Sequence, residues 1–211
     1  GFTITSTGEG QNPGPMTRSM FQLKKVDDMD IFGADEFIHY GQKVRIVSND
    51  YLYRKPLALS SYKQTAAICS PCSNKQLACM SSNNKSYDGV WIIDALDPVY
   101  RFEKQGEVVP ANTPVLLRHV QTSVYLGACS SNKYKNDFGT EHEVYCFNHS
   151  TLNRSQNLAL EKEGRLTADV PSKFQDEQNQ FLLVTAPDAS LSRPIADLQA
   201  FDMDTFIKEI K

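Results

Sequence analysis

The chain has 211 residues, of which 40% are hydrophobic and 22% are charged, a balance typical of a globular protein that buries an apolar core. Its formal net charge is −3, whereas a protein that neutralises a phosphate backbone is normally basic. No apolar run approaches the roughly 20 residues that cross a bilayer. Composition therefore argues against nucleic acid and against a membrane as partners.

Short apolar segments recur along the chain after an irregular start at residues 1–15, which are rich in Gly, Thr and Pro. Clusters of Gly, Pro, Asn, Asp and Ser separate these segments, which is the pattern of short strands joined by turns. We expect strands at residues 20–23, 44–47, 57–59, 77–80, 90–93, 115–117, 124–126, 144–147, 158–160 and 181–184. A series of this kind is typical of an antiparallel barrel or sandwich.

Internal similarity indicates a repeated unit. Two segments open alike and lead through a polar gap to a similar second strand; they begin at residues 40–46 and 110–116 and reach residues 57–61 and 125–129. Three segments close alike, with an aromatic residue followed by aliphatic residues, at 21–23, 91–93 and 181–183. Three closings with two openings indicate a threefold repeat whose first opening is missing from this sequence.

One such repeat cannot bury its own apolar face, so three of them must pack together. A threefold set of four-strand repeats predicts an all-β protein with a β-trefoil-like barrel; a generic antiparallel sandwich is the alternative. We expect one domain over residues 1–187. The last part of repeat one covers about 1–35, repeat two about 38–97, and repeat three about 106–187.

Residues 188–211 differ from the rest of the chain and form a predicted C-terminal tail. Phe201, Phe206, Ile207 and Ile210 lie at near-helical spacing after two interrupting prolines, with an aspartate available to cap a short helix. Such a helix could dock on a partner. It could equally pack on its own domain.

The cysteines do not predict a metal or redox site. Cys69 and Cys72 have CxxC spacing, but no second pair supplies the four ligands of a structural zinc, and the segment is rich in strands. Five cysteines are an odd number, which favours reduced thiols over a disulfide framework. Residues 28–33 imitate the start of an EF-hand, yet Phe32 and His39 occupy ligand positions. We expect no cofactor and no metal.

No catalytic constellation stands out either. The Glu141-His142-Glu143 segment could be drawn as an acid–base group, but neither a nucleophile nor a partner occurs at motif spacing, so His142 is interpreted as a surface or turn residue. A phosphate-binding glycine loop is absent. We interpret Trp91 as a core residue of the barrel and not as a platform for sugar. The sequence therefore predicts a non-enzymatic binding module without a small-molecule substrate.

An ordered series of segments carries a family resemblance from about residue 18 to residue 186. These segments are Ile38–Val44, Leu57–Ser61, Phe102–Gly106, Val109–Asn112, Glu141–Val144 and Phe181–Thr185. The chain resembles the MIR-type trefoil repeat and, more specifically, the cilia- and flagella-associated protein 161 family. It departs from the family pattern before Gly1, where an N-terminal region is missing, at 148–178, which is longer, and past Pro187, where the tail is extended.

The resemblance implies a structural microtubule inner protein. Such a protein would lie in the A-tubule lumen of ciliary doublet microtubules, against tubulin and other microtubule inner proteins. The expected localisation is accordingly the cytoplasm and cytoskeleton, in the axoneme of a cilium or flagellum. No catalytic residue is implied. The alternative is a soluble, lectin-like trefoil that binds carbohydrate or another small ligand.

Basic residues near the two repeat openings would suit an acidic partner such as tubulin. We therefore name two groups of candidate partner-binding residues. They are the basic residues Arg45, Arg54, Lys55, Lys63 and Arg118, and the tail residues Phe201, Phe206 and Ile207. An ordinary solvated surface of mixed charge is the competing interpretation of the basic group.

Overall fold

A computed structural model describes residues 2–6, 20–26, 37–49, 55–137, 139–149, 162–164 and 175–184. Its strands are β1 (Phe2–Thr3), β2 (Thr5–Ser6), β3 (Phe21–Lys25), β4 (Lys43–Ser48), β5 (Ala58–Ser61), β6 (Gln76–Ser81), β7 (Trp91–Ala95), β8 (Pro114–His119), β9 (Leu126–Asn136), β10 (Gly139–Cys146) and β11 (Gln180–Leu182). Two short 3-10 helices, η2 (Tyr87–Gly89) and η3 (Glu177–Asn179), precede β7 and β11. Within these ranges, no helix has the length and apolar character needed to span a bilayer.

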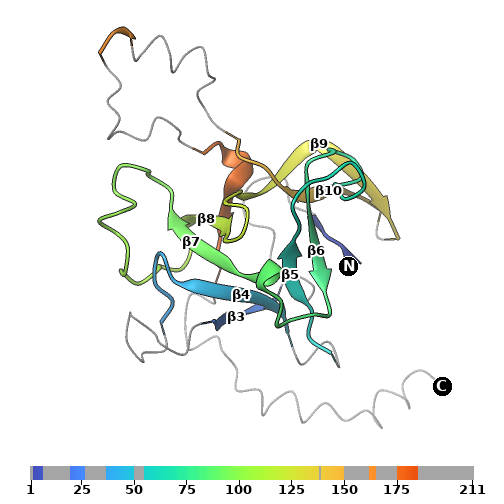
Figure 1. The fold of residues 1–211 in the computed structure, drawn as a ribbon, viewed down its shortest axis with the longest axis horizontal. Helices are drawn as coiled ribbons and strands as arrows, with labels where there is room; N and C mark the ends of the chain where they lie inside the picture. Colours follow the sequence, from blue (N-terminus) through green and yellow to red (C-terminus); the bar gives the residue numbers. More distant parts are fainter. Residues whose placement is uncertain are drawn as a thin grey trace, which may run out of the picture.

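The strands form one curled, 11-stranded sheet in the order β11-β8-β7-β4-β5-β6-β10-β2, and β1, β3 and β9 pair with β6, β4 and β10. The β3–β4 and β7–β8 pairs join the end of one predicted repeat to the start of the next. The β5–β6 and β9–β10 pairs are hairpins within predicted repeats two and three, and they project from the strands β3, β4, β7 and β8 (Figure 1). This architecture confirms the predicted all-β class.

The expected strands agree with the observed ones wherever the structure describes them. The irregular start expected at residues 1–15 is wrong for residues 2–6, because β1 and β2 there pair with β6 and β10. The segment predicted at 124–126 is the least accurate, because β9 begins at Leu126 and continues to Asn136. The segment at 158–160, the EF-hand-like segment at 28–33 and the tail at 188–211 lie outside the described residues. The repeat limits stay a prediction.

The core lies inside the curled sheet and is built from alternate residues of the strands. Trp91 is fully buried, and its indole nitrogen donates to the carbonyl of Leu59 at 2.8 Å, which satisfies the polar group that the ring carries into an apolar site. Val44, Ile93 and Val115 pack with it in one cluster. The interpretation of Trp91 as a core residue is thus confirmed.

Candidate functional site

A half-buried ion pair between β7 and β8 lies at the centre of the candidate site. Asp94 and Arg118 are diagonal neighbours on the same face, because Ile92 pairs with Arg118 and Asp94 with Leu116. Arg118 Nε donates to Asp94 Oδ2 at 2.6 Å, and Nη2 donates to Oδ1 at 3.3 Å. This forked contact raises the pKa of Arg118, since the hydrogen bonds favour its charged form.

Two further side chains surround the pair. The Tyr125 hydroxyl donates to Asp94 Oδ2 at 3.1 Å, and burial raises the pKa of Tyr125 to about 12, so the phenol stays a neutral donor. Arg101 donates through Nε to the carbonyl of Ala95 at 3.0 Å and through Nη2 to that of Leu96 at 3.4 Å. Its guanidinium lies 5.9 Å from the centre of the Tyr125 ring, within the range of a cation–π contact.

A tight turn at residues 40–41 closes the other side of the site. The Gly41 amide donates to the carbonyl of Ile93 at 3.0 Å, and the Gly106 amide donates to that of Tyr40 at 2.9 Å. Gly41 has a φ of +81°, and a Cβ there would lie 2.8 Å from Cγ of Gln105. Glycine is required at this position because the turn needs a positive φ and because Gln105 packs directly over it.

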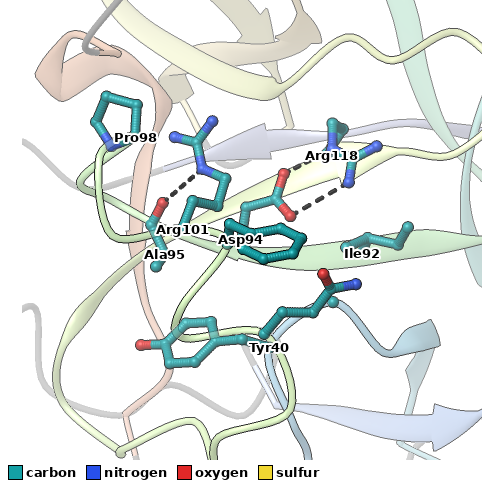
Figure 2. Close-up of a pocket in the computed structure, with 10 residues that line it drawn as sticks. Tyr40, Ile92, Asp94, Ala95, Pro98, Arg101 and Arg118 are labelled. Carbon is teal, nitrogen blue, oxygen red and sulfur yellow. Dashed lines mark hydrogen bonds and ion pairs between the residues drawn. The ribbon is translucent and has the colours of Figure 1, made fainter. Parts of the chain in front are cut away.

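These elements line an open cavity of about 340 Å³, a size at which pockets can hold a small ligand or a side chain. Figure 2 shows Arg101 and Arg118 on either side of Asp94, with Tyr40 across the space from them. The lining residues are Tyr40, Gly41, Ile92, Asp94, Ala95, Pro98, Arg101, Phe102, Gln105 and Arg118. The charged residues of the lining are two arginines and one aspartate, which gives the cavity a surplus of positive charge.

The arrangement leaves hydrogen-bond donors available to a ligand. Both oxygens of Asp94 already accept hydrogen bonds, from Arg118 and Tyr125, so the carboxylate is occupied as an acceptor. Each arginine uses Nε and Nη2, and no described residue accepts a hydrogen bond from Nη1 of either one. The cavity therefore offers unused guanidinium donors, which favour a carboxylate or another planar acceptor.

The candidate partner-binding residues occupy different places in the structure. Arg118 lines the cavity, whereas Arg45 on β4 donates to the backbone carbonyls of Ser86 and, at 3.1 Å, Lys85, and burial lowers its pKa. The side chains of the candidate residues Lys55 and Lys63 are exposed. Arg54, Phe201, Phe206 and Ile207 lie outside the described residues. The role of all eight in partner binding stays a prediction.

The CxxC segment is a turn held by a buried carboxylate. The amides of Cys72 and Ser73 donate to Oε1 and Oε2 of Glu143, each at 2.8 Å, and Glu143 is fully buried on β10. Within the described ranges, no group of three metal-ligating side chains occurs. The segment Glu141-His142-Glu143 therefore contributes a structural anchor, and His142 lies half-buried inside a strand and not at a turn.

Sequence reasoning missed three residues that shape the cavity: Asp94, Arg101 and Phe102. One signal was available, since Asp94 directly follows the apolar run 90–93 within the same strand. An acid in such a position is buried and requires partners. Nothing in the sequence indicates that Arg101 turns back onto the strand end, because its two acceptors are backbone carbonyls.

The fold and the site define an all-β domain with a cavity beside strands β7 and β8, lined by two arginines and one aspartate. A family profile described as "Cilia- and flagella-associated protein 161-like domain" matches residues 6–158. The chain therefore belongs to the cilia- and flagella-associated protein 161-like family, which confirms the resemblance found in the sequence. A search of the curated proteins finds no match.

Two solved structures are similar to the chain. The SDF2-like protein from Arabidopsis thaliana aligns with a TM-score of 0.51 at 20% identity, over 86% of this chain and 81% of that chain. The protein O-mannosyltransferase Pmt1-Pmt2 complex of S. cerevisiae, bound to the sugar donor, aligns with a TM-score of 0.43 at 16% identity, over 89% of this chain and 24% of that chain. The first likeness shows the fold alone and, with the strand pairing, confirms the predicted β-trefoil-like barrel.

Proposed function

We propose that the chain is a non-enzymatic structural protein of the axoneme, which binds tubulin and neighbouring inner proteins in the A-tubule lumen of ciliary doublet microtubules. Membership of the cilia- and flagella-associated family, over residues 6–158, is the observation that carries this proposal. That membership associates the chain with cilia and flagella, and the role in the lumen is our inference.

The physical properties of the domain support such a role. A curled sheet of paired strands around a buried core holds its connecting loops in fixed positions, which limits the entropy lost on docking. Tubulin is acidic, and the cavity between Asp94, Arg101 and Arg118 has a surplus of positive charge. In a microtubule lattice each contact is repeated, so modest individual affinities combine into firm retention.

One observation favours a second function, that of a lectin-like module for carbohydrate or another small ligand. The cavity combines aromatic side chains, Tyr40 and Phe102, with the polar groups of Asp94 and Gln105, and such combinations also recognise small polar ligands. A glycan array separates the two functions, because a lectin-like module binds defined sugars in the absence of any axonemal protein.

Fractionation of cilia tests the first function. The tagged chain is expressed in a ciliated cell, the membrane is removed with detergent, and the axonemes are washed at increasing salt concentration. We expect the chain to stay with the doublet microtubules through washes that remove a tagged inert control of similar size, and cryo-electron tomography should locate it inside the A-tubule. Release of the chain together with the control would contradict the proposal.

A further inference from the structure

The connection between β7 and β8 exposes apolar side chains beside the cavity. Four large apolar residues of this connection are at least 45% exposed, with Phe102 at 85%; the others are Val99, Tyr100 and Val108. Single exposed apolar residues are common on protein surfaces, but a group within one loop at the rim of a cavity is typical of an interaction site. We call residues 97–108 the rim loop.

The rim loop is held in place by its own hydrogen bonds. The Lys104 amide donates to the carbonyl of Tyr100 at 2.9 Å, and the Val99 amide donates to Oδ1 of Asp97 at 2.9 Å. The loop is also fixed to the turn at 40–41 through Gly106. Its apolar side chains are therefore presented by an ordered backbone, which lowers the entropic cost of binding a partner.

Charge complementarity limits what can fill the cavity. Arg101 and Arg118 retain Nη1 donors that no described residue uses, and a planar guanidinium matches a carboxylate in geometry. A nucleic acid is disfavoured because the net charge of the chain is −3, and the acidic Glu103 and Glu107 on the rim loop confine the attraction for an acid to the cavity, where the charged lining residues are Arg101, Arg118 and Asp94. A free carboxylate would leave the apolar rim uncovered.

We propose that the cavity and the rim loop form a docking site for a protein segment that places an Asp or Glu side chain in the cavity, against the Nη1 groups of Arg101 and Arg118 that Asp94 does not use. Apolar residues on either side of that acid cover Phe102 and its neighbours on the rim loop. The site deepens the proposed function, on which it rests, since it states the chemistry by which this domain holds a neighbouring protein.

A peptide array with the full chain tests the site directly. The probes are short acetylated peptides with a central Glu flanked by Leu, Phe or Ser in all combinations, and the same peptides with a central Gln. We expect the best binders to combine Glu with apolar flanks, and to bind about tenfold or more weakly once Glu is replaced by Gln, as is usual for losing a hydrogen bond to a charged group.

Two variants and two matched controls connect binding to the site. Arg101→Gln removes a cation and Phe102→Ala removes the most exposed aromatic ring, and each should weaken the best peptides about tenfold. Lys104→Gln, a charge change on the same loop outside the cavity lining, and Tyr87→Ala, an aromatic ring that is 52% exposed elsewhere, should change binding less than about twofold. Phe102 is so exposed that its variant should fold normally, which circular dichroism checks.

The outcomes separate this site from the proposed function. Binding that ignores the Glu-to-Gln change, or that survives both Arg101→Gln and Phe102→Ala, overturns the site. So does competition by neutral oligosaccharide. In cilia, a wild-type chain that stays on the axoneme while Phe102→Ala is released supports both proposals. Equal retention of the wild type, Arg101→Gln and Phe102→Ala overturns the docking site and leaves the axonemal role standing.

Discussion

Replacing Asp94 by Asn tests whether the ion pair organises the site. The substitution keeps the size of the side chain but removes its charge, and the new amide group can present a donor toward the Arg118 guanidinium. The side chain of Asp94 is 5% exposed and that of Arg118 is 30% exposed. Exposed pairs contribute about 0–1 kcal/mol, and breaking a buried pair costs about 3–5 kcal/mol, so we expect Asp94→Asn to lower the free energy of unfolding by about 2–3 kcal/mol.

The assay uses the fluorescence of Trp91, the one tryptophan in the sequence, which is fully buried and so reports unfolding in urea. The urea midpoint should fall while the slope of the transition stays the same, because the surface exposed on unfolding is unchanged. In a thermal scan the same loss corresponds to a decrease in Tm of about 4–12 °C for a domain of this size.

A double-mutant cycle then isolates the pair itself. Arg118→Gln alone should cost a similar amount, and the double variant should be more stable than the sum of the two single losses by about 1 kcal/mol or more. A loss below about 0.5 kcal/mol for Asp94→Asn, or fully additive losses, would refute the conclusion that this contact is stabilising.

Three further predictions follow from other contacts. Burial lowers the pKa of His119, so the unfolded chain takes up its proton first as the pH falls below about 6.5, and stability should decrease as the pH falls from there towards the lowered folded pKa. Urea titrations of the wild type should show this slope, and those of His119→Gln should show a smaller one, because burial also lowers the pKa of His149; an equal slope in both would contradict the role of His119. Gly41→Ala should lower the free energy of unfolding by about 1–2 kcal/mol because of the positive φ, and by a further amount because the new Cβ meets Gln105. The further loss should disappear when Gln105 is replaced by Ala. Equal losses with Gln105 and with Ala at position 105 would be inconsistent with the 2.8 Å approach of a Cβ at 41 to Cγ of Gln105. Glu143→Gln should lower the free energy of unfolding by about 1.5–3 kcal/mol. Burial first and the Glu143 charge second raise the pKa of the Cys72 thiol, so removing that charge should speed alkylation of Cys72, measured by mass spectrometry. An unchanged alkylation rate would contradict that electrostatic link.

The strands from β3 to β8 and β11 were predictable because each contains a short apolar segment bounded by turn residues, and burial of one face requires that pattern; β1 and β2 were not, since residues 2–6 lack such a segment. The outer part of β9 could not be predicted in this way, because Lys133 and its neighbours are polar and alternate between exposed and half-buried positions. That part is a strand because it pairs with β10, as in Lys133 opposite His142. Cross-strand pairing decides the structure of such a segment, and its own composition does not.

The candidate site was predictable only in part. The sequence indicated Arg118 as a candidate binding residue. Its ion pair with Asp94, however, depends on the register of β7 against β8, which the identity of single residues does not reveal. The role of Glu143 was hidden for a similar reason, because its hydrogen-bond donors are backbone amides more than sixty positions away. A residue whose backbone makes such a contact can have any side chain, so the contact cannot be predicted from residue type.

The construction of the cavity separates its variable part from its fixed part. Its inner wall includes side chains from β7 and β8, whose positions are set by the barrel. Its entrance is the rim loop, which is tied to the rest of the domain through Arg101 and through backbone contacts of Gly106, Glu107 and Val108 with residues 39–40. Exchanging the exposed residues of that loop should thus redirect the domain to a different acidic segment at little cost in stability. The barrel can act as a scaffold in which substitutions in a single loop change the preferred partner.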